Sequence, residues 1–80
     1  MTDDPDLKAQ YYVFRHARDS GDRETAADEA LAFLEMLDAV ENVEAGRGEQ
    51  PSPDEAEWRR EARAEVEELL ETDLAKDGAV

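Results

Sequence analysis

The fold is decided by residues 7–40, which read LKAQYYVFRHARDSGDRETAADEALAFLEMLDAV. Apolar residues recur there every three or four positions, the spacing of one face of an α-helix. The first stripe consists of Leu7, Tyr11, Phe14 and Ala17. The second consists of Ala26, Ala30, Phe33, Leu37 and Val40, whose alternating steps of four and three residues form a heptad-like seam. Residues 7–40 therefore predict two amphipathic helices that face a common core.

The segment Ser20-Gly21-Asp22 separates the two stripes. Gly21 suits the left-handed conformation that ends many helices, and Asp22 suits the N-cap of the next helix. So short a connection folds two helices back on each other as an antiparallel hairpin. With Asp4 as cap and Pro5 in the first turn, we expect helices over residues 5–19 and 23–45, the second ending at Gly46.

A third helix is predicted over residues 53–75. Ser52, Pro53 and Glu55 form a capping box, in which a serine and a glutamate three residues later satisfy the first free amides. Its apolar stripe consists of Trp58, Ala62, Val66 and Leu69, with Leu70 alongside and Leu74 further on. We expect residues 46–52 to be a flexible linker and residues 77–80 to fray.

The expected fold is therefore all-α, a small three-helix bundle in a single domain over residues 1–80. The pattern leaves open whether the third helix packs within its own chain or swaps into a neighbour.

The chain is strongly acidic. It carries 23 aspartates and glutamates against 9 lysines and arginines, a formal net charge of −14, and has no cysteine. Repulsion between these charges opposes a compact state in dilute buffer, whereas molar salt shortens the screening length to about 3 Å. Net charge is −1 over residues 1–21, −7 over 22–46 and −6 over 47–80. We therefore expect the first helix, the least repelled, to lie between the other two.

Two resemblances follow from these residues. Seven arginines against two lysines, abundant acidic residues and no isoleucine resemble the composition of cytoplasmic proteins from salt-loving archaea. Residues 9–38 resemble a single tetratricopeptide-type helical hairpin, although Phe14 stands where that family prefers a small residue. The second resemblance implies a helical hairpin and transfers no peptide-binding residue.

The same sequence favours a cytoplasmic location. The acidic start, Met1 to Asp6, does not read as a signal peptide, and no apolar run is long enough to cross a membrane.

No catalytic, metal-binding or cofactor-binding residue is predicted, and we expect the chain not to be an enzyme. His16 has neither a nucleophile nor further ligands at a useful spacing, so it is interpreted as an ordinary surface residue. The carboxylates of residues 19–24 lack the spacing of a calcium loop. Without cysteine, thiolate chemistry is excluded.

The only basic cluster is Arg59, Arg60 and Arg63, next to Trp58. The glutamates around it favour ion pairs along the helix, Arg59 with Glu55 and Arg63 with Glu67, over a phosphate-binding patch.

Large apolar residues that lie off the main stripes suggest an interaction surface. Five candidates lie off the main stripes: Tyr12, Val13, Leu31, Met36 and Val43. Trp58, from the stripe of the third helix, is a sixth candidate. We therefore predict a non-catalytic protein–protein interaction module adapted to high salt, whose partner is another protein or a second copy of itself. No direct nucleic-acid or membrane partner is expected. The alternative is an acidic nucleic-acid mimic or regulator that binds a basic partner through helix 23–45.

Overall fold

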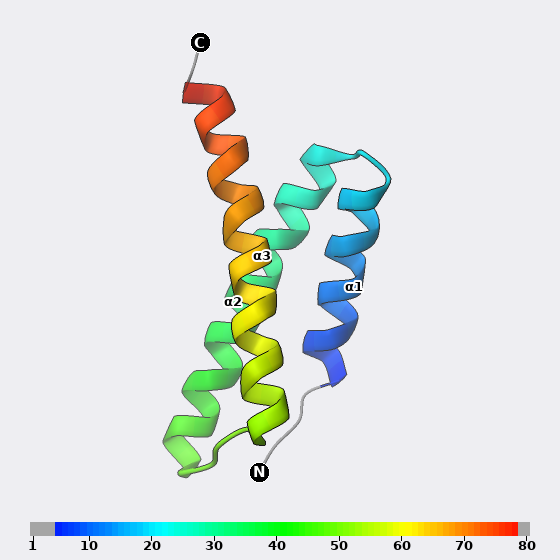
Figure 1. The fold of residues 1–80 in the computed structure, drawn as a ribbon. Coiled ribbons are helices and arrows are strands. Elements are labelled where there is room, and N and C mark those ends of the chain that lie inside the picture. Colours follow the sequence, from blue (N-terminus) through cyan, green and yellow to red (C-terminus); the bar gives the residue numbers. More distant parts are fainter. Residues whose placement is uncertain (1–4, 79–80) are drawn as a thin grey trace.

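The protein folds into three helices in a computed structural model, which describes the backbone of residues 5–78 and the side chains of residues 5–72 (Figure 1). The helices are α1 (Pro5–Asp19), α2 (Arg23–Arg47) and α3 (Pro53–Gly78), and no strand occurs within residues 5–78. The predicted all-α three-helix bundle is confirmed. The third helix, whose placement the sequence left open, packs here against α2 of its own chain.

The turn between α1 and α2 has the predicted geometry. Gly21 adopts a left-handed conformation with φ of +81°, and the backbone amide of Asp22 donates to the carbonyl of Ala17 at 3.0 Å. The Asp22 carboxylate accepts a hydrogen bond from the Thr25 amide at 3.1 Å, which caps α2. This bond lowers the pKa of Asp22, because it favours the ionised carboxylate.

The end of α2 differs from the prediction. Gly46 lies inside the helix, and α2 continues to Arg47. The left-handed residue is Gly48, with φ of +70°, and the amides of Gly48 and Glu49 donate to the carbonyls of Ala45 and Glu44. Two glycines stand two residues apart, and only the second adopts the conformation that closes the helix. The connection to α3 is thus residues 48–52.

The start of α3 agrees with the prediction, because the Ser52 hydroxyl accepts a hydrogen bond from the Glu55 amide at 3.2 Å. The helix runs to Gly78, three residues past the expected end. Of the tail predicted to fray, Ala79 and Val80 lie outside the described residues, as does the side chain of Leu74.

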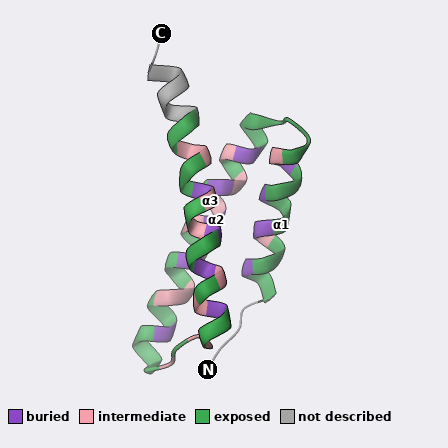
Figure 2. Cartoon of the chain, in the orientation of Figure 1, coloured by how far each residue is buried: buried purple, intermediate pink, exposed green. Residues whose placement is uncertain are grey.

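The core is small and is built from the predicted stripes (Figure 2). Its fully buried large side chains are Leu7, Phe14, Phe33, Leu37 and Val66, joined by Tyr11, Ala30 and Ala62. Burying a leucine or phenylalanine side chain contributes about 1.5–3 kcal/mol. Only a few such side chains are available here, so polar contacts between the helices also matter.

The central helix is α2, and the expectation that the first helix lies in the middle is wrong. α2 packs closely against both neighbours, whereas α1 and α3 meet mainly through long side chains such as Arg18 and Glu65. Repulsion between the two acidic helices is offset by ion pairs that cross from α3 to α2, Arg59 with Glu44 and Arg63 with Glu41. The net charges of whole helices did not predict these pairs, because the electrostatic energy depends on which charged groups are in contact.

Candidate interaction surfaces

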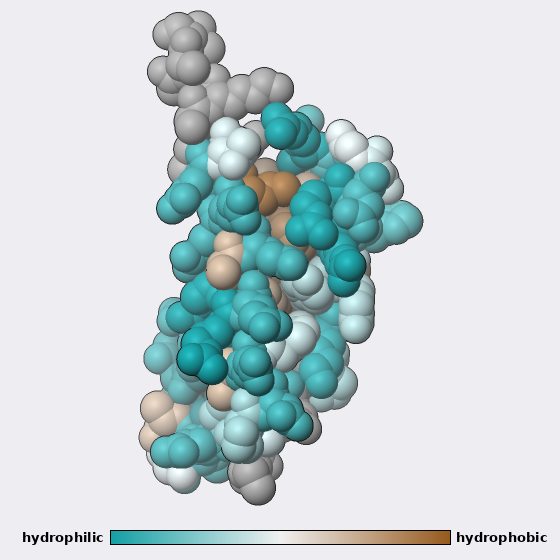
Figure 3. All heavy atoms as spheres, in the orientation of Figure 1, coloured by the Kyte–Doolittle hydropathy of each residue, from teal (hydrophilic) through white to brown (hydrophobic). Residues whose placement is uncertain are grey.

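Four of the six candidate surface residues are strongly exposed. Exposed fractions are 60% for Tyr12, 49% for Val13, 52% for Leu31 and 51% for Val43. The space-filling view shows how sparse apolar atoms are on the face it presents, which is mostly hydrophilic (Figure 3). The four exposed candidates are thus apolar residues on a surface that is otherwise mostly hydrophilic.

The other two candidates pack inward. Met36 and Trp58 are partly buried against the core cluster. The Trp58 ring makes edge contacts with Tyr11 and Phe33, at centroid distances of 5.5 and 6.2 Å. Trp58 is therefore mainly a core residue, in keeping with its place in the apolar stripe of the third helix, and the expectation that it belongs to an interaction surface is wrong.

Tyr12 and Val13 belong to one exposed face of α1. We define the α1 outer face as Ala9, Tyr12, Val13 and His16, which follow the spacing of a single helix face and are all exposed. This face lies opposite the buried stripe of α1 and contains no carboxylate. Over its whole length α1 has three basic residues and two acidic ones, a net charge of +1. His16 is an exposed helix residue, as predicted.

Leu31 has a different setting. It lies in the middle of a line of exposed residues on α2 with steps of four, three, four and three. We define the acidic row as the four carboxylates of this line, Glu24, Asp28, Glu35 and Asp38. Val43 lies elsewhere on α2, one turn beyond Val40, which packs against the core. The exposed apolar candidates therefore form no single continuous patch.

A buried cluster of charges joins α2 to α3. The Arg59 guanidinium donates two hydrogen bonds to the Glu44 carboxylate, at 2.7 and 3.1 Å, and a third to Glu55 at 3.0 Å. Side-chain exposure is 4% for Arg59, 9% for Glu44 and 1% for Glu55. Hydrogen bonds to Glu44, with a further contribution from Glu55, raise the pKa of Arg59 against the lowering effect of burial.

One atom of this cluster is incompletely satisfied. Oε1 of Glu55 has no hydrogen-bond partner among the described residues, although Lys8 Nζ of α1 lies 3.6 Å away. The pairing of Arg59 with Glu55 was predicted, but Glu44 was missed. The sequence could have indicated that Glu44 is buried, because Glu44 follows Val40 by four residues and so continues the core seam of α2. Arg63 was expected to pair with Glu67 and instead contacts Glu41 at 2.7 Å.

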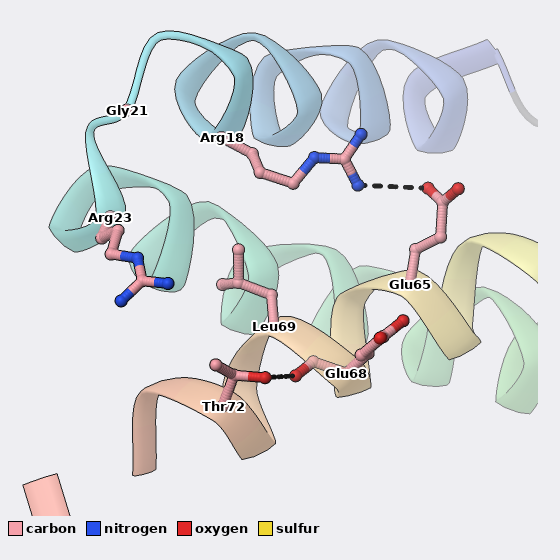
Figure 4. A pocket seen from close by; sticks show the side chains of 7 residues that line it. All are labelled: Arg18, Gly21, Arg23, Glu65, Glu68, Leu69 and Thr72. Carbon is pink, nitrogen blue, oxygen red and sulfur yellow. Dashed lines mark hydrogen bonds and ion pairs between the residues drawn. The ribbon is translucent and has the colours of Figure 1, made fainter. Parts of the chain in front are cut away.

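A hollow of about 500 Å³ lies between the α1–α2 turn and α3. Arg18, Gly21 and Arg23 line one side, while Glu65, Glu68, Leu69 and Thr72 line the other (Figure 4). Several of these polar groups already have partners. Arg18 lies 3.7 Å from Glu65, and the Thr72 hydroxyl donates to the Glu68 carbonyl at 2.9 Å.

Tyr11 also donates a hydrogen bond to Glu65, and burial together with this carboxylate raises the pKa of Tyr11. Among the described residues that line the hollow, none is a serine, cysteine or histidine next to a base, the arrangement used in nucleophilic catalysis. Among the described residues, no three metal-binding side chains gather at one point.

Comparison of the chain with protein-family models, curated proteins and solved structures finds no match. Within the described part of the chain, no helix combines the length and the apolar character needed to span a bilayer. The geometry of the chain itself is therefore the basis for any functional inference.

Proposed function

We propose that this chain is a small, non-catalytic protein–protein interaction module that associates with a second copy of itself and works in the cytoplasm of a cell with high internal salt. The observation that carries the proposal is the exposure of Tyr12, Val13, Leu31 and Val43, each about half exposed or more. Covering these side chains with a partner would remove apolar surface from water, which favours association.

The salt requirement follows from the net charge of −14. Two such copies repel each other in dilute buffer, but molar salt reduces the screening length to about 3 Å and leaves apolar attraction dominant. Self-association is therefore expected to become stronger as salt rises, the reverse of an interaction held by surface ion pairs.

The test is light scattering coupled to size-exclusion chromatography, over micromolar to millimolar protein, in dilute and in molar potassium chloride. We expect the mean mass to rise with protein concentration, and to rise further in the salt-rich buffer. A monomer mass that stays constant under all conditions would refute self-association. A pull-down from the native host at high salt then tests for a different protein partner.

A second candidate function rests on the acidic row. Its four exposed carboxylates follow one face of α2, and Leu31 lies among them. Such a line of charges with an apolar centre suits a basic amphipathic helix or a basic nucleic-acid-binding protein. A basic amphipathic peptide is the probe. For this function, binding should weaken steeply with salt and in the variant Asp28→Asn with Glu35→Gln, whereas binding that is indifferent to both would exclude it.

A further inference from the structure

We propose that the α1 outer face is the surface through which two copies of this chain pair, α1 against α1 across a two-fold axis. This inference rests on the proposed function, since it names the site of self-association. Its occupant is a second copy of the same helix, and the contact centres on Tyr12 and Val13.

The position of α1 makes its outer face available. α1 packs on the central helix with Leu7, Tyr11 and Phe14, and its opposite side has no described element over it (Figure 1). Among the described residues, Tyr12 is the most exposed large apolar residue, at 60%, and Val13 next to it is 49% exposed. Tyrosine is enriched among the residues that dominate binding energy at protein interfaces, because it buries a large rigid ring.

Charge selects this face over the other exposed apolar residues. By sequence, α1 has a net charge of +1, whereas α2 has −5 and α3 has −6. Two copies that approach through α2 or α3 bring like charges together, which opposes association. Leu31 lies within the acidic row, and Val43 belongs to the same acidic helix. Of the three helices in the described chain, only α1 can meet a second copy without adding strong repulsion.

The placement of Tyr12 also suits a two-fold contact. Residue 12 is the midpoint of Pro5–Asp19, so two α1 helices that meet there overlap along most of their length. In an isologous interface both copies contribute the same surface, so Tyr12 and Val13 of each copy lie at the centre of the contact.

The contact is small. A helix of 15 residues is about 22 Å long. A contact limited to α1 buries less than about 1,200 Å² in total, which is typical of weak and reversible complexes. We therefore expect dissociation constants in the micromolar to millimolar range that decrease with salt.

The experiment measures dimerisation by sedimentation equilibrium in molar potassium chloride. The test variants are Tyr12→Ala and Val13→Ala. The matched controls are Leu31→Ala and Val43→Ala, which truncate apolar side chains of similar exposure on α2. Alanine favours helix at all four positions, and circular dichroism checks that each variant keeps its helical content.

We expect Tyr12→Ala to weaken dimerisation by roughly tenfold or more and Val13→Ala to weaken it by less, as for central interface residues. Both controls should remain within about twofold of the unmodified chain, as for residues outside an interface. Because two separate variants probe the face, failure of one to fold leaves the other as a valid test.

Two results would overturn the inference, and they differ in what else they imply. A dimer that is weakened by Leu31→Ala or Val43→Ala but not by Tyr12→Ala and Val13→Ala would place the contact on α2, and the proposed function would stand. A chain that stays monomeric at every concentration and salt level would refute the α1 contact and self-association together.

Discussion

Substituting Arg59 with methionine should destabilise the fold by about 3–5 kcal/mol. The Arg59 side chain is 4% exposed, and its partners Glu44 and Glu55 are 9% and 1% exposed. Methionine fills part of the volume but leaves two carboxylates in the interior without the guanidinium. A buried charge that has lost its partner costs far more than a surface charge, because water cannot replace the missing hydrogen bonds.

The matched control is Arg63→Met. Arg63 contacts Glu41 across the same two helices at 2.7 Å, the same closest distance as between Arg59 and Glu44. Its side chain is 42% exposed and that of Glu41 is 44% exposed. Breaking an exposed pair of this kind changes the free energy of unfolding by about 1 kcal/mol or less. The two variants thus differ mainly in the burial of the pair.

The assay is urea denaturation followed by far-UV circular dichroism in molar potassium chloride, because urea leaves the ionic strength unchanged. A double variant, Glu44→Leu with Arg59→Leu, removes the arginine and one of its two carboxylates while Glu55 stays buried, and is expected to recover part of the stability lost in Arg59→Met. Equal losses in Arg59→Met and Arg63→Met would show that Arg59 is solvated, and the reasoning from burial would then be wrong.

Four further predictions concern the core, the helix ends and the solvent. Phe33→Ala should reduce the free energy of unfolding by about 3–5 kcal/mol, measured by the same urea titration, because a fully buried ring is replaced by a cavity. Gly48→Ala should destabilise the fold by about 1–2 kcal/mol, because φ is +70° at that residue. Gly46→Ala, in the helix interior, should stabilise the fold by about 0.5–1 kcal/mol. Changes of the same sign in both variants would contradict the assigned end of α2. Asp22→Asn should be less stable than the unmodified chain near neutral pH and almost equally stable at strongly acidic pH. The lowered pKa of Asp22 adds stability above the ordinary aspartate value of about 3.9, and this stability disappears as the pH falls through the folded-state pKa. The melting temperatures of the variant and the unmodified chain should therefore converge in acid. Raising potassium chloride from dilute to molar should increase the melting temperature of the unmodified chain, and a melting temperature that is flat or falls with salt would contradict the role given to self-repulsion.

The helix starts could be predicted because their signals are local. Pro5, Asp22 and Ser52-Pro53 set the conformation or satisfy the amides of their own first turns, and the structure begins its helices at the expected residues. The end of α2 was missed by two residues, because Gly46 and Gly48 carry the same intrinsic preference. The hydrogen bonds of the last turn distinguish them.

The candidate surface was predictable only in part. Tyr12 and Val13 lie off the apolar stripe of their own helix, so the sequence alone indicated their exposure. Trp58 lies on the stripe of its own helix and was still expected at the surface, but contacts with Tyr11 and Phe33 from two other helices place it mainly in the core. Residues at the edge of a stripe are buried or exposed according to what the neighbouring helices place beside them.

The sequence by itself therefore determined that this chain forms three amphipathic helices, with a tight hairpin first, because helical periodicity and capping act over a few residues. Only the tertiary structure decided that α2 is central, that Glu44 and Arg59 form a buried pair, and that no described element covers the α1 outer face. Those features depend on which side chains from distant parts of the chain come into contact. The electrostatic energy of a charged group depends on its burial and its distance from other charges far more than on the number of charges in the sequence.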